Sequence, residues 1–246
     1  MPLDSHARLR RHAEGLNQAY AHHSAFAVMS RALDDPAVGP VALVSSFGAE
    51  SVVLLHMLSV MDRTQPVLFL ETGMLFPETL AYQRAVADRL GLRDVRLIRP
   101  DSGDLFQMDP DGDLNTRDPD TCCTIRKTKP LELALQGFDA WITGRKRYQG
   151  GQRADLQFFE AEAGKLKINP LAHWTPKDVA DYMENNRLPR HPLVAQGYPS
   201  LGCAPCTSKV APDEDPRAGR WRGREKTECG LHFAAGRVVP GAIVAG

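Results

Sequence analysis

The sequence lacks an apolar run long enough to cross a membrane, and its first residues lack the apolar core of a secretory signal. An excess of either charge is also missing, because 30 basic residues balance 30 acidic ones. This balance argues against a general polyanion binder, so any anion site must be local. Internal repeats and low-complexity segments are absent too. We therefore expect a globular cytoplasmic protein that works neither on nucleic acid nor in a membrane.

Cysteine is scarce, and its distribution is informative. Four of the five cysteines form two tight pairs, the adjacent Cys122 and Cys123 and the C-x-x-C of Cys203 and Cys206. A bond between adjacent cysteines would be strained, and a reducing cytoplasm favours ligands or catalysts over disulfides. Four thiolates suit a zinc ion or an iron–sulfur cluster, although the adjacent pair departs from the usual spacing of zinc ligands. Three interpretations therefore stay open: a zinc site, a cluster site and unrelated buried thiols. The leftover Cys229 is a candidate nucleophile.

Apolar runs and helical patterns alternate through the first two thirds of the chain, which predicts an α/β fold with a mainly parallel, twisted sheet and helices on both faces. We expect a helical segment over residues 1–35 and one domain over 1–210. After Val210 the charge density rises, which predicts a mobile tail over 211–246. Strands are expected near 41–44, 66–70, 95–98, 140–144 and 166–168, and helices near 52–61, 77–90, 128–135 and 176–186.

Two loops follow expected strands and therefore open at the same edge of the sheet, where ligands bind in such folds. The first, residues 45–51, offers serine hydroxyls and a glycine at the start of a helix, where an anion is favoured. It is neither a Walker A loop nor a G-x-G-x-x-G, and an ordinary turn is the alternative. The second, residues 145–153, carries four cations, which fit either an anion site or a solvated turn.

The basic tail surrounds the fifth cysteine. Arg217, Arg220 and further cations precede Cys229, and His232 follows it. Nearby cations lower the pKa of a thiol and favour the nucleophilic thiolate. A solvated or nucleic-acid-binding segment is the alternative for such a tail, and a lone histidine is often incidental.

These motifs together resemble the sulfonucleotide reductase family, in order and over about residues 41–232. The loop over 45–51 resembles the modified pyrophosphate loop of that family, and the two cysteine pairs resemble its iron–sulfur subgroup, which acts on adenosine 5′-phosphosulfate (APS). The other matching stretches are Glu71-Thr72-Gly73, Cys122-Cys123 with Arg126-Lys127, Thr143-Gly144-Arg145 with Arg147, Arg217-Ala218-Gly219-Arg220 and Glu228-Cys229-Gly230-Leu231-His232.

The resemblance implies an adenine-nucleotide α-hydrolase-like fold and an APS reductase of sulfate assimilation and cysteine biosynthesis. It implies a four-iron, four-sulfur (4Fe–4S) cluster on Cys122, Cys123, Cys203 and Cys206. Cys229 would take the sulfonyl group to form S-sulfocysteine, and thioredoxin or a similar dithiol would release sulfite. Lys127 and His232 would assist catalysis. Substrate binding would fall to Ser45, Ser46, Phe47, Gly48, Glu50, Ser51, Glu71, Thr72, Gly73, Arg145, Arg147, Arg217 and Arg220.

Two stretches depart from the family pattern. Arg222-Gly223-Arg224 replaces the further tryptophans that many relatives have after Trp221, and Thr207-Ser208-Lys209 stands where Thr-Arg-Pro is common. Three alternative functions are a reductase of the 3′-phosphorylated nucleotide (PAPS), an ATP-dependent tRNA-thiolating enzyme and a metal-stabilised nucleotide-binding module without catalysis. The Ser-Gly-Gly-x-Asp-Ser loop that is usual in the tRNA-thiolating enzymes is absent here. A homo-oligomer is left open.

Overall fold

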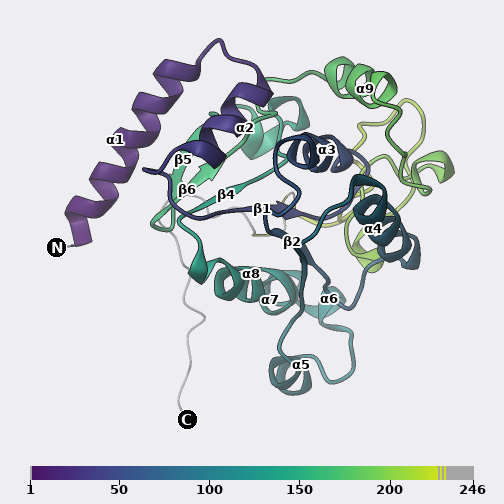
Figure 1. The fold of residues 1–246 in the computed structure, drawn as a ribbon. Helices are drawn as coiled ribbons and strands as arrows, with labels where there is room; N and C mark the ends of the chain where they lie inside the picture. The colour runs from purple at the N-terminus through teal and green to yellow at the C-terminus, as the bar shows by residue number, and fades with distance from the viewer. Residues whose placement is uncertain (1, 227, 229, 231–246) are drawn as a thin grey trace.

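The computed structural model describes residues 2–226, 228 and 230, and this part of the chain forms one six-stranded sheet between two layers of helices (Figure 1). The strand order is β3-β2-β1-β4-β6-β5, parallel except for β5, which runs antiparallel to β6. The expected α/β fold is therefore confirmed. The strands are β1 (Val41–Ser45), β2 (Val67–Leu70), β3 (Val95–Ile98), β4 (Ala140–Ile142), β5 (Phe159–Glu162) and β6 (Lys165–Ile168).

Each expected helix is present, with the N-terminal region forming two of them, and three short helices between residues 102 and 123 were not among the expected ones. The helices are α1 (Pro2–Tyr20), α2 (Ala25–Asp34), α3 (Val52–Met61), α4 (Pro77–Leu90), α5 (Ser102–Met108), α6 (Leu114–Arg117), α7 (Pro119–Cys123), α8 (Lys129–Ala134) and α9 (Pro176–Asn185). The sequence signal at α9 is a capping box, in which Thr175 and Asp178 bond each other's backbone. None of the helices in the described residues is long and apolar enough to cross a bilayer.

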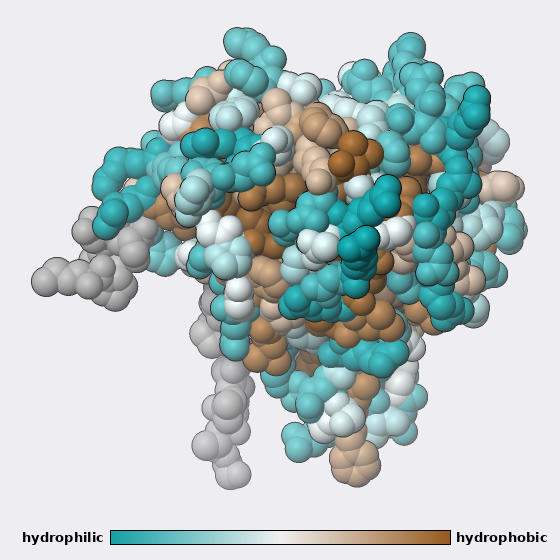
Figure 2. Space-filling view, viewed as in Figure 1, coloured by the Kyte–Doolittle hydropathy of each residue, from teal (hydrophilic) through white to brown (hydrophobic). Residues whose placement is uncertain are grey.

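Alternate residues of the strands pack into two separate apolar cores, one on each face of the sheet. Leu43 faces the large core against α1–α4 and α9, whereas its neighbour Ala42 joins Leu131 and Trp141 in a smaller core under α8. Figure 1 shows these two helical layers above and below the sheet. Figure 2 shows polar side chains over much of the outer surface and apolar surface in the hollow between the layers. Both faces of the central strands are thus buried, as their unbroken apolar runs indicate.

One edge of the sheet is covered by the N-terminal helix. The side chain of Asn17 on α1 accepts from the backbone N–H of Phe159 at 2.9 Å and donates to its carbonyl at 2.8 Å. Phe159 begins β5, the last strand of the sheet, so Asn17 satisfies backbone groups that an edge strand leaves open.

Helix α7 continues into α8 through a π-helical turn over Thr124–Thr128. Pro130 follows directly, and its missing N–H interrupts the regular α-helical bonding. The sequence predicts a helix only from Thr128, but the helical stretch begins at Pro119. The π turn carries Arg126 and Lys127, and such turns are frequent at functional sites.

His191 links α4 to the segment that follows α9. The backbone N–H of Leu193 donates to its Nδ1 at 3.2 Å, so Nε2 carries the proton and faces the Thr79 hydroxyl at 3.1 Å. The side chain is almost wholly buried, and burial lowers the pKa of His191 to about 4.

We expect this histidine to make the fold sensitive to mild acid. The unfolded chain binds a proton at His191 near pH 6.5 and the folded chain only near pH 4. The contribution of neutral His191 to the free energy of unfolding is therefore complete above pH 6.5 and is lost as pH falls toward 4. The loss is at most about 3 kcal/mol. Urea unfolding at pH 7.5 and 5 should show a smaller drop for His191→Gln than for the wild type, and an unchanged drop for His22→Gln, whose side chain is exposed. Equal drops in all three proteins would contradict the assignment.

Candidate active site

A cavity of about 260 Å³ opens where β1 and β4 end, the point at which the chain connections leave in opposite directions. Its walls come from the β1–α3 loop, the β4 loop, the π turn and the segment after Pro199. Of the substrate-binding residues predicted from the sequence, those that line it are Ser45, Ser46, Gly48, Glu50, Ser51, Thr72, Arg145, Arg217 and Arg220, and Lys127 lies there too. The structure therefore brings most of the predicted residues to one place.

The serine-rich loop is shaped by its own side chains. Ser45 Oγ accepts from the backbone N–H of Phe47 at 3.1 Å, and Ser51 Oγ accepts from that of Gly48 at 3.0 Å. Phe47 takes the left-handed conformation, with φ of +47°, and turns its ring into the core against Phe69. Phe47 is accordingly absent from the cavity wall and supports the loop from beneath. The serine hydroxyl protons remain available to a ligand.

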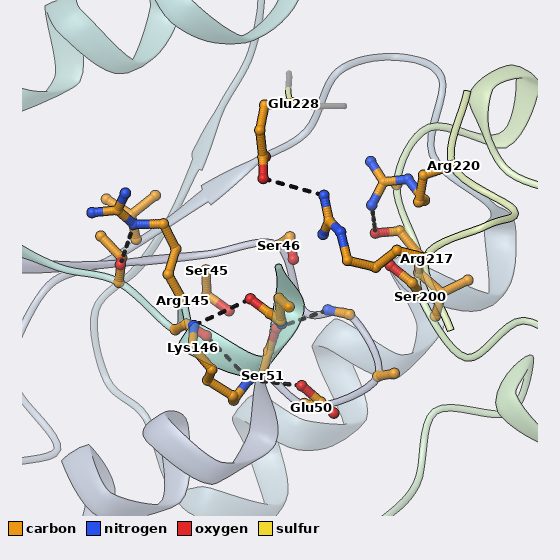
Figure 3. A pocket seen from close by; sticks show the side chains of 18 of the residues that line it. Ser45, Ser46, Glu50, Ser51, Arg145, Lys146, Ser200, Arg217, Arg220 and Glu228 are labelled. Atoms are coloured by element: carbon orange, nitrogen blue, oxygen red, sulfur yellow. Dashed lines mark hydrogen bonds and ion pairs between the residues drawn. The ribbon is translucent and has the colours of Figure 1, made fainter. Parts of the chain in front are cut away.

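The basic loop after β4 does not present its cations freely. Arg145 is buried and forms an ion pair with Glu160. The ammonium of Lys146 pairs with Glu50 at 2.7 Å, and Figure 3 labels both residues. Burial lowers the pKa of Lys146, and the Glu50 carboxylate opposes this shift. Arg147 was expected near the substrate phosphate, but its Nε donates to the Leu156 carbonyl at 2.7 Å and it is not part of the wall.

Residues 217–221 are anchored against the body of the protein although they form no helix or strand. The backbone N–H of Trp221 donates to the Cys206 carbonyl at 3.1 Å, and its indole ring is buried with the Arg220 guanidinium 4.5 Å from the ring centroid. A β-bridge joins Arg220 to Thr207, and the close backbone approach leaves no room for a Cβ at Gly219. The predicted domain boundary at 210 stays a prediction, but Arg217 and Arg220 are held at the cavity.

Arg217 and Arg153, the last cation of the basic loop, meet at a carboxylate on the wall that the sequence did not reveal. Arg153 makes a bidentate contact with Glu228, from Nε to Oε1 at 2.6 Å and from Nη2 to Oε2 at 2.7 Å. Arg217 Nη2 reaches the same carboxylate at 3.3 Å, as Figure 3 shows. All three residues line the cavity. The glycine-rich sequence before Arg153 signals a turn, but the partner lies 75 residues away and no spacing reveals it.

The four paired cysteines line one small cavity next to the first. Burial and the neighbouring Cys123 sulfur raise the pKa of Cys122 to about 11, and burial also raises the pKa of Cys206, which Lys127 and Arg220 oppose. Arg126 lies on the same wall, and its buried Nε has no hydrogen-bond partner within the described residues. Converging thiols and an unsatisfied donor fit a bound group that takes thiolate ligands and accepts hydrogen bonds.

No group of three or more His, Cys, Asp or Glu side chains in residues 2–226, 228 and 230 is placed to hold a metal ion. The four cysteines form a cysteine-rich site whose thiols fit a bound group with thiolate ligands.

The two cavities share part of their walls. Lys127 and Cys203 line both, and the Thr72 hydroxyl lies 3.2 Å from Cys203 Sγ. Two neighbouring residues that were predicted to bind substrate do not line the first cavity, namely Glu71 and Gly73. The Glu71 carboxylate accepts from the Gly73 N–H at 2.7 Å and pairs with Arg99, so these residues shape the turn.

The two remaining predicted residues, Cys229 and His232, lie outside the described residues. Their described neighbours are at the site. Glu228 lines the larger cavity, and the carbonyl of Gly230 accepts from the Thr128 hydroxyl at 3.5 Å.

Comparison with known proteins agrees with this geometry. Residues 40–209 match the model of the phosphoadenosine phosphosulfate reductase domain. A Mesorhizobium japonicum protein named adenosine 5′-phosphosulfate reductase is 48% identical, with 90% of this chain and 87% of the relative covered. One of the same name from a Chelativorans species is 47% identical, covering 94% of each. A Gloeobacter violaceus protein named phosphoadenosine 5′-phosphosulfate reductase is 44% identical, covering 78% and 82%.

Solved structures support the same fold. The phosphoadenylyl-sulfate reductase of Candida auris, in a phosphate complex, superposes with a TM-score of 0.69 at 26% identity and covers 81% of this chain and 97% of its own. An FMN adenylyltransferase of Candida glabrata, at 16% identity and a TM-score of 0.55 over 90% and 85%, shares the fold alone.

Proposed function

Because the chain belongs to the family of phosphoadenosine phosphosulfate reductase domains, we propose that it is an adenylyl-sulfate reductase that converts APS to sulfite and AMP. The observation that supports this proposal most directly is the position of Lys127, which lines both the cation-lined cavity and the four-cysteine cavity. The relatives that are 47–48% identical and named for APS support the choice of substrate.

The cavity offers a place for each part of the substrate. Backbone N–H groups and the hydroxyls of Ser45, Ser46 and Ser51 stand at the start of α3, where the positive end of a helix favours a phosphate. Lys127, Arg217 and Arg220 supply charge on the opposite wall. Cations there stabilise the negative charge that develops on the leaving phosphate.

In the proposed first step, Cys229 thiolate attacks the sulfur of the sulfate group. A sulfur–sulfur bond forms and the bond from that sulfur to the bridging oxygen breaks, so AMP leaves with the electron pair and Cys229 holds a sulfonate. This is covalent catalysis by an activated thiol. The cations around the cavity favour the thiolate.

In the second step, one thiolate of a dithiol such as thioredoxin attacks Cys229 Sγ and releases sulfite. Its second thiol then resolves the mixed disulfide, so the dithiol is oxidised by two electrons and Cys229 is regenerated. Such an exchange suits the reducing cytoplasm. His232 is proposed to assist near the thiol.

We propose that Cys122, Cys123, Cys203 and Cys206 hold a 4Fe–4S cluster, with Arg126 Nε as a hydrogen-bond donor toward it. When bound, the cluster supplies a structural link between the two cysteine pairs and a fixed electrostatic environment beside Lys127. Electrons for the reaction come from the dithiol.

The second candidate is reduction of the 3′-phosphorylated nucleotide, because the matching family model and the 44% identical relative carry that name. The four-cysteine cavity favours APS, since cysteine pairs of this kind characterise the APS-reducing group that the motifs resemble. Purified anaerobic protein should therefore show broad brown visible absorbance, with about four irons per chain. Colourless, iron-free protein that turns over the 3′-phosphorylated nucleotide would favour the second candidate.

The direct test is a single-turnover experiment. Purified protein mixed with APS and no dithiol should gain the mass of one sulfonate on the peptide that contains Cys229, because the second step cannot proceed. Addition of thioredoxin should remove that mass and release one sulfite per chain. A sulfonate-free Cys229 peptide while sulfite still forms would refute the mechanism.

A further inference from the structure

Glu228 fills a site made by two arginines inside the nucleotide cavity. Its side chain is 13% exposed, and the side chains of Arg153 and Arg217 are 11% and 19% exposed. Arg153 grips both carboxylate oxygens with its two parallel donors, and Arg217 adds a third contact. Such forks match the oxygens of carboxylate, phosphate and sulfate equally well.

We propose that Glu228 is a built-in occupant of an oxyanion site on Arg153 and Arg217, and that an oxygen-bearing anionic group of the substrate replaces it. This inference rests on the proposed function, because it takes the phosphosulfate of APS as the replacing group. It also makes Arg153 a substrate-binding residue, alongside Arg217.

The shielding of this contact makes replacement selective. Withdrawing Glu228 alone would leave two guanidinium charges partly buried and uncompensated, which is costly. An incoming anion restores the lost charge and hydrogen bonds as Glu228 leaves, so the exchange is nearly balanced. A neutral ligand in the same cavity provides no such compensation and should leave Glu228 in place.

The chain that leads to Glu228 begins from a fixed point at Trp221, whose side chain is buried. Gly223 beyond it has φ of +78° and no atom close to its missing side chain. Lys226, whose side chain is 11% exposed, pairs with the exposed Asp120, and Arg224 donates to the Asn115 carbonyl. These contacts tie the segment to the body of the protein beside the contact of Glu228.

The consequence concerns the nucleophile, which is the next residue. While Glu228 occupies the arginines, the chain next to the nucleophile is tied to the anion site. Arrival of the anion releases that tie, so release of the segment is coupled to occupation of the cavity.

Binding measurements on a Cys229→Ser background, which prevents turnover, test the exchange. Adding Glu228→Gln should tighten APS binding about tenfold, equivalent to about 1.4 kcal/mol, because the competing charge is gone. Adding Glu225→Gln removes the same charge from an exposed position of the same segment and should leave the affinity unchanged. Adenosine, which has no anionic group, should bind equally to all three proteins.

Equal APS affinities in the Glu228→Gln and Glu225→Gln proteins would overturn the proposal, as would tightening of APS and adenosine by the same factor. Glu228→Ala, which removes all hydrogen bonding to the arginines, provides a second variant and should behave as Glu228→Gln does. A wrong assignment of the function would give a different result from a wrong assignment of Glu228. Protein with Cys229 intact would then release no sulfite from APS.

Discussion

Replacing Cys229 with serine should abolish sulfite release and leave nucleotide binding in place. The serine hydroxyl is a poor nucleophile at neutral pH and cannot form the sulfur–sulfur bond, so turnover should fall by about 10⁴-fold or more. The walls of the cavity, as far as the described residues form them, are unchanged by this substitution, so AMP affinity should stay within about threefold of the wild type. Sulfite release with a dithiol, together with AMP titration, measures both quantities.

The internal control for this variant is the metal content. The proposed cluster ligands are the four cysteines that line the smaller cavity in the described part of the chain, so the Cys229→Ser protein should retain the iron and visible absorbance of the wild type. Loss of iron would mean that the fifth cysteine is a ligand. Retained sulfite release would show that another group carries the sulfonate.

Replacing Lys127 with alanine should cost turnover far more than stability. Lys127 borders both cavities, where it is placed to stabilise charge on the leaving phosphate, and loss of one such contact typically lowers kcat by about 10² to 10³. The matched control is Lys129→Ala, two residues along the same helical stretch. Lys129 is half exposed and pairs with Asp104, away from both cavities.

Steady-state rates and urea unfolding of both lysine variants distinguish a clamp from a structural residue. We expect Lys127→Ala to unfold within about 1.5 kcal/mol of the wild type and Lys129→Ala to retain near wild-type activity. Collapse of the Lys127→Ala protein, or equal activity losses in the two variants, would remove Lys127 from the mechanism.

The sheet was predictable because local signals and burial point the same way. The run over 41–44 has no polar alternation, and it forms a strand buried on both faces. Antiparallel β5 was missed although a signal was present. Ala163 and Gly164 both take positive φ in a two-residue turn between β5 and β6, a geometry that favours hairpins. Alanine there obscured the usual Asn-Gly or Asp-Gly signature.

The sequence predicted where the site lies in the fold, but not which side chains pair with its charged residues. Strand ends placed the serine loop and the basic loop together, as the structure confirms. Which cations face the cavity depends on carboxylates that fold in from elsewhere, such as Glu160 from β5 and Glu50 from the first loop. The Leu156 carbonyl likewise binds Arg147 away from the wall, and Glu228 binds Arg153 on it, and no local pattern encodes these partners.

The contact between Asn17 and the edge of β5 has a consequence for shortened forms of this chain. A protein beginning after Tyr20 would keep every residue that lines the two cavities, yet it would uncover the outer backbone groups of Phe159. An uncovered edge invites pairing with the same edge of another molecule. Helix α1 thus covers this edge of the sheet, and none of its residues is among the described residues that line the two cavities.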